Sequence, residues 1–274
     1  MDLRGLGTTV LMASLLAGCA GGSAGAAVDA PPARGGFVER SVRVDGAEHR
    51  YQVFVPARAQ DAGKRPVLLF LHGSGERGDD NRSQLAVGLG PHVRASAGTF
   101  PAIVVFPQAP AGSEWNELAD VVFAELDAAT REFGGDPDRT YLTGLSMGGY
   151  GTWDLALRQG YRFAALVPVC GGLVHPARPS MAVTGMADET DPYAAVAQRL
   201  RQTPVWMFHG ARDASVPVEY SRRLDAALQA AGARDARYTE FPEADHNSWD
   251  AAYATPELWT WLFAQRQPDA FRHR

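Results

Sequence analysis

Short apolar runs alternate with amphipathic segments from residue 37 to the end of the chain. Such runs, bounded by turn residues, are typical of strands, and those without polar alternation are typical of strands buried on both faces. The pattern predicts eight strands, at 37–44, 48–56, 66–72, 102–108, 140–146, 164–170, 204–210 and 236–242. The first two flank Asp45-Gly46, a pair that favours the tight turn of a hairpin.

Helical periodicity fills the intervals between the later strands. Leu118, Val122 and Leu126 recur at helical spacing, which predicts a helix over 116–133 that ends at Gly134. Further helices are predicted over 148–160, 193–201, 217–231 and 256–265. Two antiparallel strands followed by six strands with helices between them predict an α/β protein with an eight-stranded, mostly parallel sheet and helices on both faces. Residues 171–192 have no clear period and are expected to form a small cap or a surface loop.

The first 36 residues have the composition of a targeting segment and a tether. Residues 1–18 contain Arg4, an apolar run and small residues before Cys19, which is typical of a secretory signal peptide. Leu16-Ala17-Gly18-Cys19 resembles a bacterial lipobox, in which the cysteine becomes the lipidated first residue. We therefore expect an exported protein held to a bacterial membrane by a lipid on Cys19; a plain cleaved signal is the alternative.

The predicted organisation is a signal peptide (1–18), a flexible tether (19–36), one catalytic domain (37–267) and a short tail (268–274). The tether is rich in Gly, Ala and Pro and has little to bury. The net charge of −5 argues against nucleic acid as a partner, because binding to phosphates needs a basic face. An apolar content of 46% with 21% charged residues excludes a disordered chain.

A candidate nucleophile stands between a predicted strand and a predicted helix. Gly144-Leu145-Ser146-Met147-Gly148 matches G-x-S-x-G, and its position gives the strand–turn–helix context of a nucleophile elbow. So sharp a turn leaves no room for side chains at 144 and 148. We expect Ser146 to project above the sheet, with a helix N-terminus beneath it that favours developing negative charge.

A serine hydroxyl needs a base, and the base needs an acid to orient it. Asp213 and His246 follow the strands at 204–210 and 236–242, in the chain order Ser, Asp, His. They are the predicted catalytic acid and base. Other carboxylates of the region are alternatives for the acid, namely Asp188, Glu189 and Asp191, whereas the Asp245 side chain is expected to point away.

The oxyanion hole of such a site uses two backbone N–H groups. Met147, directly after the nucleophile, is expected to supply one and Ser74 the other, with Gly75 as the alternative to Ser74. His72 and His209 each close a strand before a Gly and are expected to be structural, as is Cys170 in its apolar run. No histidine spacing suits a zinc site and no Gly-rich loop suits a nucleotide, so we expect neither a metal nor a cofactor.

Five segments carry a resemblance to a known family: LHGSGERGDDN, FPQAP followed by Trp115, GLSMGGYGTW, PVWMFHGARDASVPV and DHNSWDAAY. They resemble α/β-hydrolases, and more narrowly secreted bacterial serine esterases related to polyhydroxybutyrate depolymerases and feruloyl esterases. Such proteins are often described as predicted peptidases or phospholipase/carboxylesterase-like proteins. The resemblance covers about residues 37–267 and implies an α/β-hydrolase fold with Ser146, Asp213 and His246 as its triad.

The same resemblance suggests that Trp115 and Trp249 line the substrate pocket, with packing in the core or at its rim as the alternative for both. Residues 76–81 have three interpretations: they order substrate, they brace the oxyanion loop, or they form a solvated charged turn held by local pairs. The expected activity is hydrolysis of carboxylic esters, of small molecules or of carbohydrate- or polymer-linked acyl groups, through an acyl-enzyme. A peptidase similar to prolyl oligopeptidases is the alternative. A third possibility is a surface-binding lipoprotein without catalysis on the same fold.

Overall fold

The computed structural model describes Met1, residues 35–57 and residues 63–267. The predicted signal peptide beyond Met1, Cys19, the tether as far as residue 34 and the tail 268–274 lie outside these residues. What was predicted for them stays a prediction. In the part of the chain described, no helix is both long enough and apolar enough to cross a membrane.

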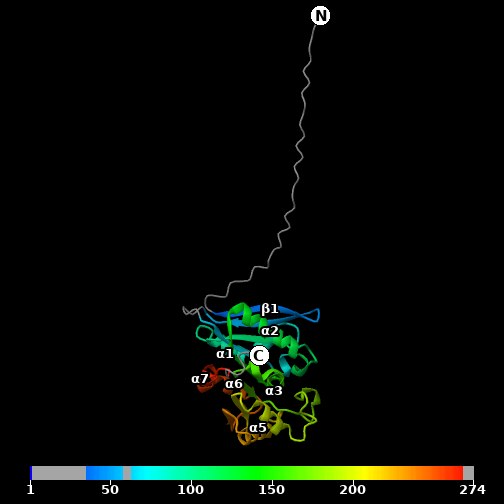
Figure 1. Ribbon diagram of the computed structural model, residues 1–274, viewed down its shortest axis with the longest axis vertical. Coiled ribbons are helices and arrows are strands. Elements are labelled where there is room, and N and C mark those ends of the chain that lie inside the picture. The colour runs from blue at the N-terminus through cyan, green and yellow to red at the C-terminus, as the bar shows by residue number, and fades with distance from the viewer. Residues whose placement is uncertain (2–34, 58–62, 268–274) are drawn as a thin grey trace. The chain divides into compact units, whose positions relative to one another are not determined.

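The described residues form one eight-stranded sheet in the order β1-β2-β4-β3-β5-β6-β7-β8. In Figure 1, β1 lies toward one end of the folded domain and α5 toward the other. Its strands are β1 (Gly36–Val44), β2 (Ala47–Val55), β3 (Arg65–Leu71), β4 (Ile103–Pro107), β5 (Gly135–Leu145), β6 (Ala165–Val169), β7 (Val205–Gly210) and β8 (Ala236–Phe241). The β1–β2 and β2–β4 pairs are antiparallel and the other pairs are parallel. The predicted mostly parallel sheet is confirmed.

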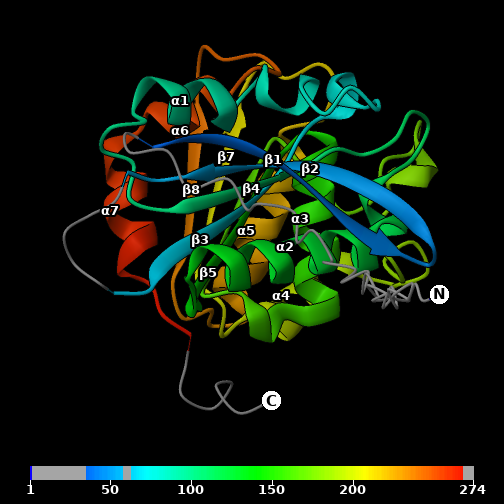
Figure 2. The same cartoon turned by 90° about the horizontal axis from the view of Figure 1, so that it is seen from above.

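Helices cover both faces of this sheet (Figure 2). One face carries α2 (Ala119–Phe133), α3 (Met147–Gln159), α4 (Pro192–Leu200) and α5 (Glu219–Ala230). The other carries α1 (Leu89–Ala95), α6 (Trp249–Ala254) and α7 (Pro256–Ala264). Strand β3 shows how one strand serves both layers: Val67 and Leu69 point into the first core, and Leu68 and Phe70 into the second.

Local sequence signals set several of the boundaries. Asp45 and Gly46 both have positive φ, 50° and 82°, as the tight turn between β1 and β2 requires. Helix α2 ends at Gly134, whose φ of 71° provides the left-handed C-cap. Its start was predicted too early: a capping box between Glu114 and Glu117 closes a separate 3-10 turn (η3, Trp115–Glu117) before α2 begins.

The segment 171–192 is a loop with one 3-10 turn, η5 (Pro179–Met181), followed by the start of α4 at Pro192. It packs against the core through buried apolar side chains, among them Leu173, Val183 and Met186. Of the two forms expected for this segment, the structure has the loop, held on the surface by these three side chains.

Candidate active site

Ser146 is the single residue between the end of β5 and the start of α3. Its backbone has φ 53° and ψ −116°, an unusual conformation for a residue with a side chain. Strain of this kind persists where the surrounding structure enforces it, and it turns the serine side chain out of the strand. Ser146 is 6% exposed, and the N-terminus of α3 lies directly behind it.

The two glycines of the motif are required by backbone contacts on either side of this turn. A Cβ on Gly148 would lie 2.0 Å from the carbonyl oxygen of Leu71, and one on Gly144 would lie 2.2 Å from that of Gly148. Neither contact is relieved by moving a side chain, because each is with backbone. The expectation that 144 and 148 have no room for side chains is confirmed.

The structure brings the three predicted triad residues together. The Ser146 Oγ lies 3.0 Å from the His246 Nε2, and the His246 Nδ1 lies 2.7 Å from the Asp213 Oδ2. A carboxylate only accepts, so Nδ1 carries the proton and the neutral ring leaves Nε2 free to accept from the serine hydroxyl. The Asp213 side chain is 0% exposed and the His246 side chain 26% exposed. Only the imidazole therefore reaches solvent between a buried acid and a nearly buried serine.

Two of the alternative acids, Asp191 and Glu189, are engaged elsewhere, and so is Asp245. Asp191 accepts from two backbone N–H groups at the start of α4 and caps that helix. Glu189 lies 3.3 Å from Arg199, and Asp245 accepts the backbone N–H of Asn247. Asp213 is thus the acid that contacts His246.

Hydrogen bonds keep the buried Asp213 carboxylate charged. Burial alone would raise its pKa, but donors on both oxygens overcome this and hold the pKa well below its usual range. The donors include the backbone of Val216 and the side chains of His246 and His209. His209 was expected to be only structural; the structure places its Nε2 3.2 Å from the Asp213 Oδ2. A second imidazole next to the acid is a feature that sequence reasoning missed.

The loop after β3 passes directly beside the nucleophile. A Cβ on Gly73 would lie 3.7 Å from the Ser146 Cβ, which places the next residue, Ser74, at the edge of the site. Ser74 begins the 3-10 turn η1 (Ser74–Glu76), and its buried Oγ has no hydrogen-bond partner among the described residues. Met147 is the first residue of α3. The two segments expected to supply oxyanion donors therefore flank Ser146.

Trp115 is a brace for this loop, and its burial leaves little of the indole to line a substrate pocket. Its side chain is 1% exposed, and its Nε1 donates to the carbonyl oxygen of His72 at 3.0 Å. The His72 ring lies edge-on to the indole, with ring centroids 4.8 Å apart. The space beside Trp115 and Met147 is a cavity of about 10 Å³, room for about one water. In its buried position the indole N–H satisfies the His72 carbonyl at the start of the loop after β3.

His72 itself is held in one neutral form. Its Nδ1 donates to the carbonyl oxygen of Gly73 at 2.6 Å, and its Nε2 accepts the backbone N–H of Ala109 at 3.0 Å. Burial lowers the pKa of His72 to about 4, since the charged form would lose its hydration. The structural role expected for His72 agrees with these contacts.

Residues 76–81 brace the loop after β3 against the loop after β4, in line with one of the roles expected for them. Arg77 pairs with Glu114 at 2.6 Å, across to the loop after β4. The Gln108 side chain donates to the backbone of Glu76 and to the Asp80 carboxylate. These contacts tie the loop after β3 to the loop after β4.

Trp249 lies at the site, where the sequence predicted it. Its ring meets the His246 ring edge-on, with centroids 5.5 Å apart, and the side chain is half-buried. A role in substrate binding stays a prediction, now with a position that suits it.

Cys170 is buried, as expected, but it lies against the triad. A ligand atom from each of Cys170, Asp213 and His246 falls within 4.8 Å of the others. A metal ion would need the thiolate, and burial raises the pKa of Cys170 far above its usual value. With the Asp213 and His246 atoms already paired to each other, this donor set does not fit a cation.

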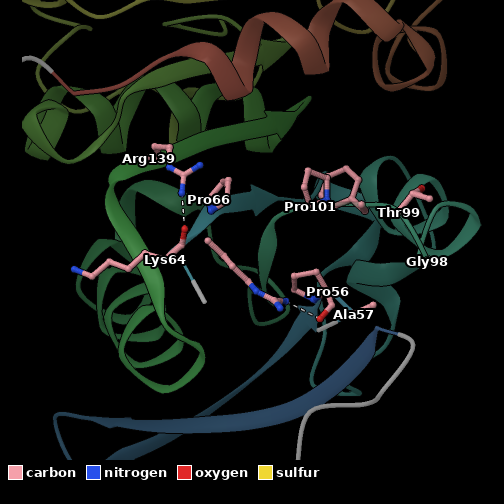
Figure 3. A pocket seen from close by; sticks show the side chains of 11 residues that line it. Pro56, Ala57, Lys64, Pro66, Gly98, Thr99, Pro101 and Arg139 are labelled. Carbon is pink, nitrogen blue, oxygen red and sulfur yellow. Dashed lines mark hydrogen bonds between the residues drawn. The ribbon is translucent and has the colours of Figure 1, made fainter. Parts of the chain in front are cut away.

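A separate cavity of about 400 Å³ opens at the opposite end of the strands from Ser146 (Figure 3). It lies where β3 begins, whereas Ser146 lies where the neighbouring β5 ends. Its two arginines are engaged with backbone: Arg139 donates to the carbonyl of Lys64, and Arg65 donates to that of Pro56 at 2.8 Å. This cavity is not an extension of the Ser146 site.

Comparison with protein-family models finds no match, and neither does comparison with curated protein sequences. Solved structures do match. A thermostable esterase has 30% sequence identity and a TM-score of 0.67 over 84% of this chain and 63% of its own. The acylaminoacyl peptidase of Pyrococcus horikoshii has 16% identity and a TM-score of 0.64, over 85% of this chain and 42% of its own. An S-formylglutathione hydrolase from Agrobacterium tumefaciens has 17% identity and a TM-score of 0.64, over 86% of this chain and 97% of its own.

These likenesses and the strand order define the fold. The chain has the α/β-hydrolase fold, with Ser146 at the strand-to-helix turn after β5. The chain spans less than two thirds of the length of the thermostable esterase.

Proposed function

We propose that this protein is a serine hydrolase that cleaves carboxylic esters through an acyl-enzyme. One observation carries the proposal: the Ser146 Oγ, the His246 ring and the Asp213 carboxylate are joined by contacts of 3.0 Å and 2.7 Å. A hydroxyl, an imidazole and a buried carboxylate in this order are what nucleophilic attack on an acyl carbon needs. The 30% identity to a thermostable esterase supports the same activity.

In this mechanism the Ser146 Oγ attacks the ester carbonyl while its proton passes to the His246 Nε2. The negative charge of the tetrahedral intermediate falls on the former carbonyl oxygen, which the Ser74 and Met147 N–H groups stabilise. His246 then gives its proton to the leaving alcohol as the carbon–oxygen bond breaks. Water then attacks the acyl carbon while His246 takes its proton. His246 returns this proton to the Ser146 Oγ as the carboxylic acid leaves.

Asp213 stays ionised throughout. Its charge stabilises the imidazolium that forms twice in the cycle, and its bond to Nδ1 holds the ring in the tautomer that faces Ser146. The depressed pKa of the Asp213 carboxyl supports this role, because it keeps the acid charged.

The test compares hydrolysis of short p-nitrophenyl esters by the wild type and by Ser146→Ala. We expect the variant to lose activity by a factor of about 10⁴ or more while its circular dichroism spectrum and melting temperature stay near those of the wild type. Ser41→Ala is the matched control, since Ser41 lies on β1 and its hydroxyl donates to the Glu48 carboxylate there. Turnover by Ser146→Ala at the level of Ser41→Ala would end the proposal.

A panel of substrates assigns the ester class. The resemblance to depolymerases and feruloyl esterases favours acyl groups of hydroxyalkanoate or feruloyl type, so the panel contains these beside acetyl-sugar and short acyl esters. Peptide substrates belong in it as well, since an acylaminoacyl peptidase shares this fold. Cleavage of peptides without cleavage of any ester would favour the peptidase alternative. A folded protein that turns over nothing and does not react with a fluorophosphonate would favour the non-catalytic one.

We also propose that Cys19 carries a lipid that anchors the protein to a bacterial membrane, facing away from the cytoplasm. The support is the sequence Leu16-Ala17-Gly18-Cys19, which lies outside the described residues. The expected result is that the wild type fractionates with membranes and incorporates labelled palmitate, and that Cys19→Ala does neither. Equal labelling of the two proteins would refute the anchor.

A further inference from the structure

A second imidazole stands behind the catalytic carboxylate. His209 is 0% exposed at the end of β7, and its Nε2 lies 3.2 Å from the Asp213 Oδ2. That oxygen is the one that accepts from the His246 Nδ1 at 2.7 Å. One carboxylate oxygen therefore lies between two imidazole rings, one exposed to solvent and one buried.

The contacts of His209 determine which of its nitrogens carries the proton. Its Nε2 lies 3.0 Å from the carbonyl oxygen of Val216 as well as 3.2 Å from the carboxylate, and both groups only accept. Nε2 therefore carries a proton, which is hydrogen-bonded to the Val216 carbonyl and also faces the carboxylate. Its Nδ1 lies 2.7 Å from the Ser221 Oγ, a hydroxyl able to donate to or accept from this nitrogen. Both nitrogens of the buried ring have hydrogen-bond partners, which holds the ring in this orientation.

These contacts fix the turn that carries Asp213. The Asp213 Oδ1 accepts the backbone N–H groups of Ser215 and Val216, each at 2.8 Å. His209 completes the arrangement, since its single N–H reaches both the carboxylate at the start of the turn and the Val216 carbonyl at its end. Rotating the carboxylate away from His246 would break this shared contact in a place that water does not reach, where an unmade hydrogen bond is costly.

We propose that His209 is a positioning residue of the triad: its Nε2–H holds the Asp213 carboxylate in the rotamer that receives the His246 Nδ1–H. The inference rests on the proposed function of Ser146, His246 and Asp213. It assigns to His209 no contact with substrate, and it explains why a histidine occupies this place when an apolar side chain would fill it.

Three variants separate positioning from packing. His209→Asn ends where the ring Nδ1 stands, so it keeps a partner for Ser221 and loses the donor to Asp213. His209→Gln is longer and brings an amide N–H to the place of the ring Nε2. Ser221→Ala removes the buried partner of Nδ1 and leaves the Nε2–H in place, so it reports what a lost hydrogen bond on the other side of the ring does.

The measurements are kcat and KM for a short p-nitrophenyl ester, the melting temperature, and the downfield proton resonance of the His246 Nδ1–H bonded to a carboxylate. We expect His209→Asn to lower kcat by about tenfold or more with KM within about twofold, because the loss falls on the transition state. The Nδ1–H resonance should shift or broaden in the same variant. His209→Gln should recover most of the activity and the resonance. Ser221→Ala should lower the melting temperature while its kcat and its resonance stay close to the wild type.

Two results would overturn the proposal. One is a folded His209→Asn with wild-type kcat and an unmoved Nδ1–H resonance. The other is an equal loss of kcat in Ser221→Ala and His209→Asn, with no recovery in His209→Gln, which would mean that packing alone is at work. A wild type without esterase activity would instead refute the proposed function, and the resonance would still decide the role of His209.

Discussion

The burial of His72 makes the free energy of unfolding of this protein depend on pH. The pKa of the buried ring is lowered from 6.5 to about 4 by burial, and the side chain is 1% exposed. In the unfolded chain the ring binds a proton below pH 6.5, whereas in the folded protein it stays neutral down to about pH 4. The unfolded state binds more protons in this window, so the free energy of unfolding falls as the pH falls.

The shift of about 2.5 pKa units corresponds to about 3 kcal/mol, at 1.36 kcal/mol per unit. About 2 kcal/mol of this is lost between pH 7 and pH 4.5, since the unfolded ring is almost fully protonated at the lower pH. Replacing His72 by Gln removes the titration while an amide oxygen can still accept from the Ala109 N–H. The variant is expected to be less stable than the wild type at pH 7 and to lose about 2 kcal/mol less on acidification.

The assay is urea unfolding at several pH values for the wild type and His72→Gln, with Glu125→Gln as a control of opposite sign. Burial raises the pKa of Glu125 well above its usual value, so this group stabilises the fold at low pH and loses that contribution as the pH rises. Glu125→Gln should therefore make the free energy of unfolding fall more steeply on acidification, whereas His72→Gln should make it fall less steeply. Parallel curves for the wild type and His72→Gln would refute the reasoning, because His72 would then not be the group that titrates.

Three substitutions test other parts of the account. Gly148→Ala should lower the free energy of unfolding by about 3 kcal/mol or more, because its Cβ would lie 2.0 Å from the Leu71 carbonyl oxygen. The control is Gly98→Ala, whose Cβ would have no atom within 4 Å and should leave that free energy nearly unchanged in urea unfolding. Near-neutral stability of Gly148→Ala would contradict the expectation. Trp115→Phe should lower the free energy of unfolding by about 2 kcal/mol through the lost bond to the His72 carbonyl, and should lower kcat equally for acetyl and aromatic esters; a loss confined to aromatic esters would restore Trp115 as a pocket wall. Trp249→Ala should lower kcat/KM by about three- to tenfold, because its ring packs edge-on to His246; unchanged kinetics would remove it from the site.

Features with a local cause could be predicted from the sequence. The Asp45-Gly46 turn, the end of α2 at Gly134 and the elbow glycines each follow from a backbone conformation or a close approach that only certain residues allow. The order of Ser146, Asp213 and His246 followed from the strands that precede them. These are the residues that the structure brings together.

Features that depend on tertiary contacts could not be predicted. The short helices α1 and α6 have no side-chain cap, and buried residues such as Leu89 and Tyr253 hold them to the sheet. The family resemblance placed Trp115 at the substrate, but only the fold shows that its N–H faces the His72 carbonyl. The contact of His209 with Asp213 had one signal in the sequence, a spacing of four residues across the turn after β7, which is too common to interpret alone.

Covalent labelling tests the central claim most directly. A fluorophosphonate forms a stable phosphonyl ester with a serine that an imidazole activates, and peptide mass spectrometry identifies the serine. The account predicts one adduct on the native wild type, at Ser146, which is absent after heat denaturation and forms far more slowly in Asp213→Asn. A folded protein that stays unlabelled, or an adduct on another serine with Ser146 free, would contradict it.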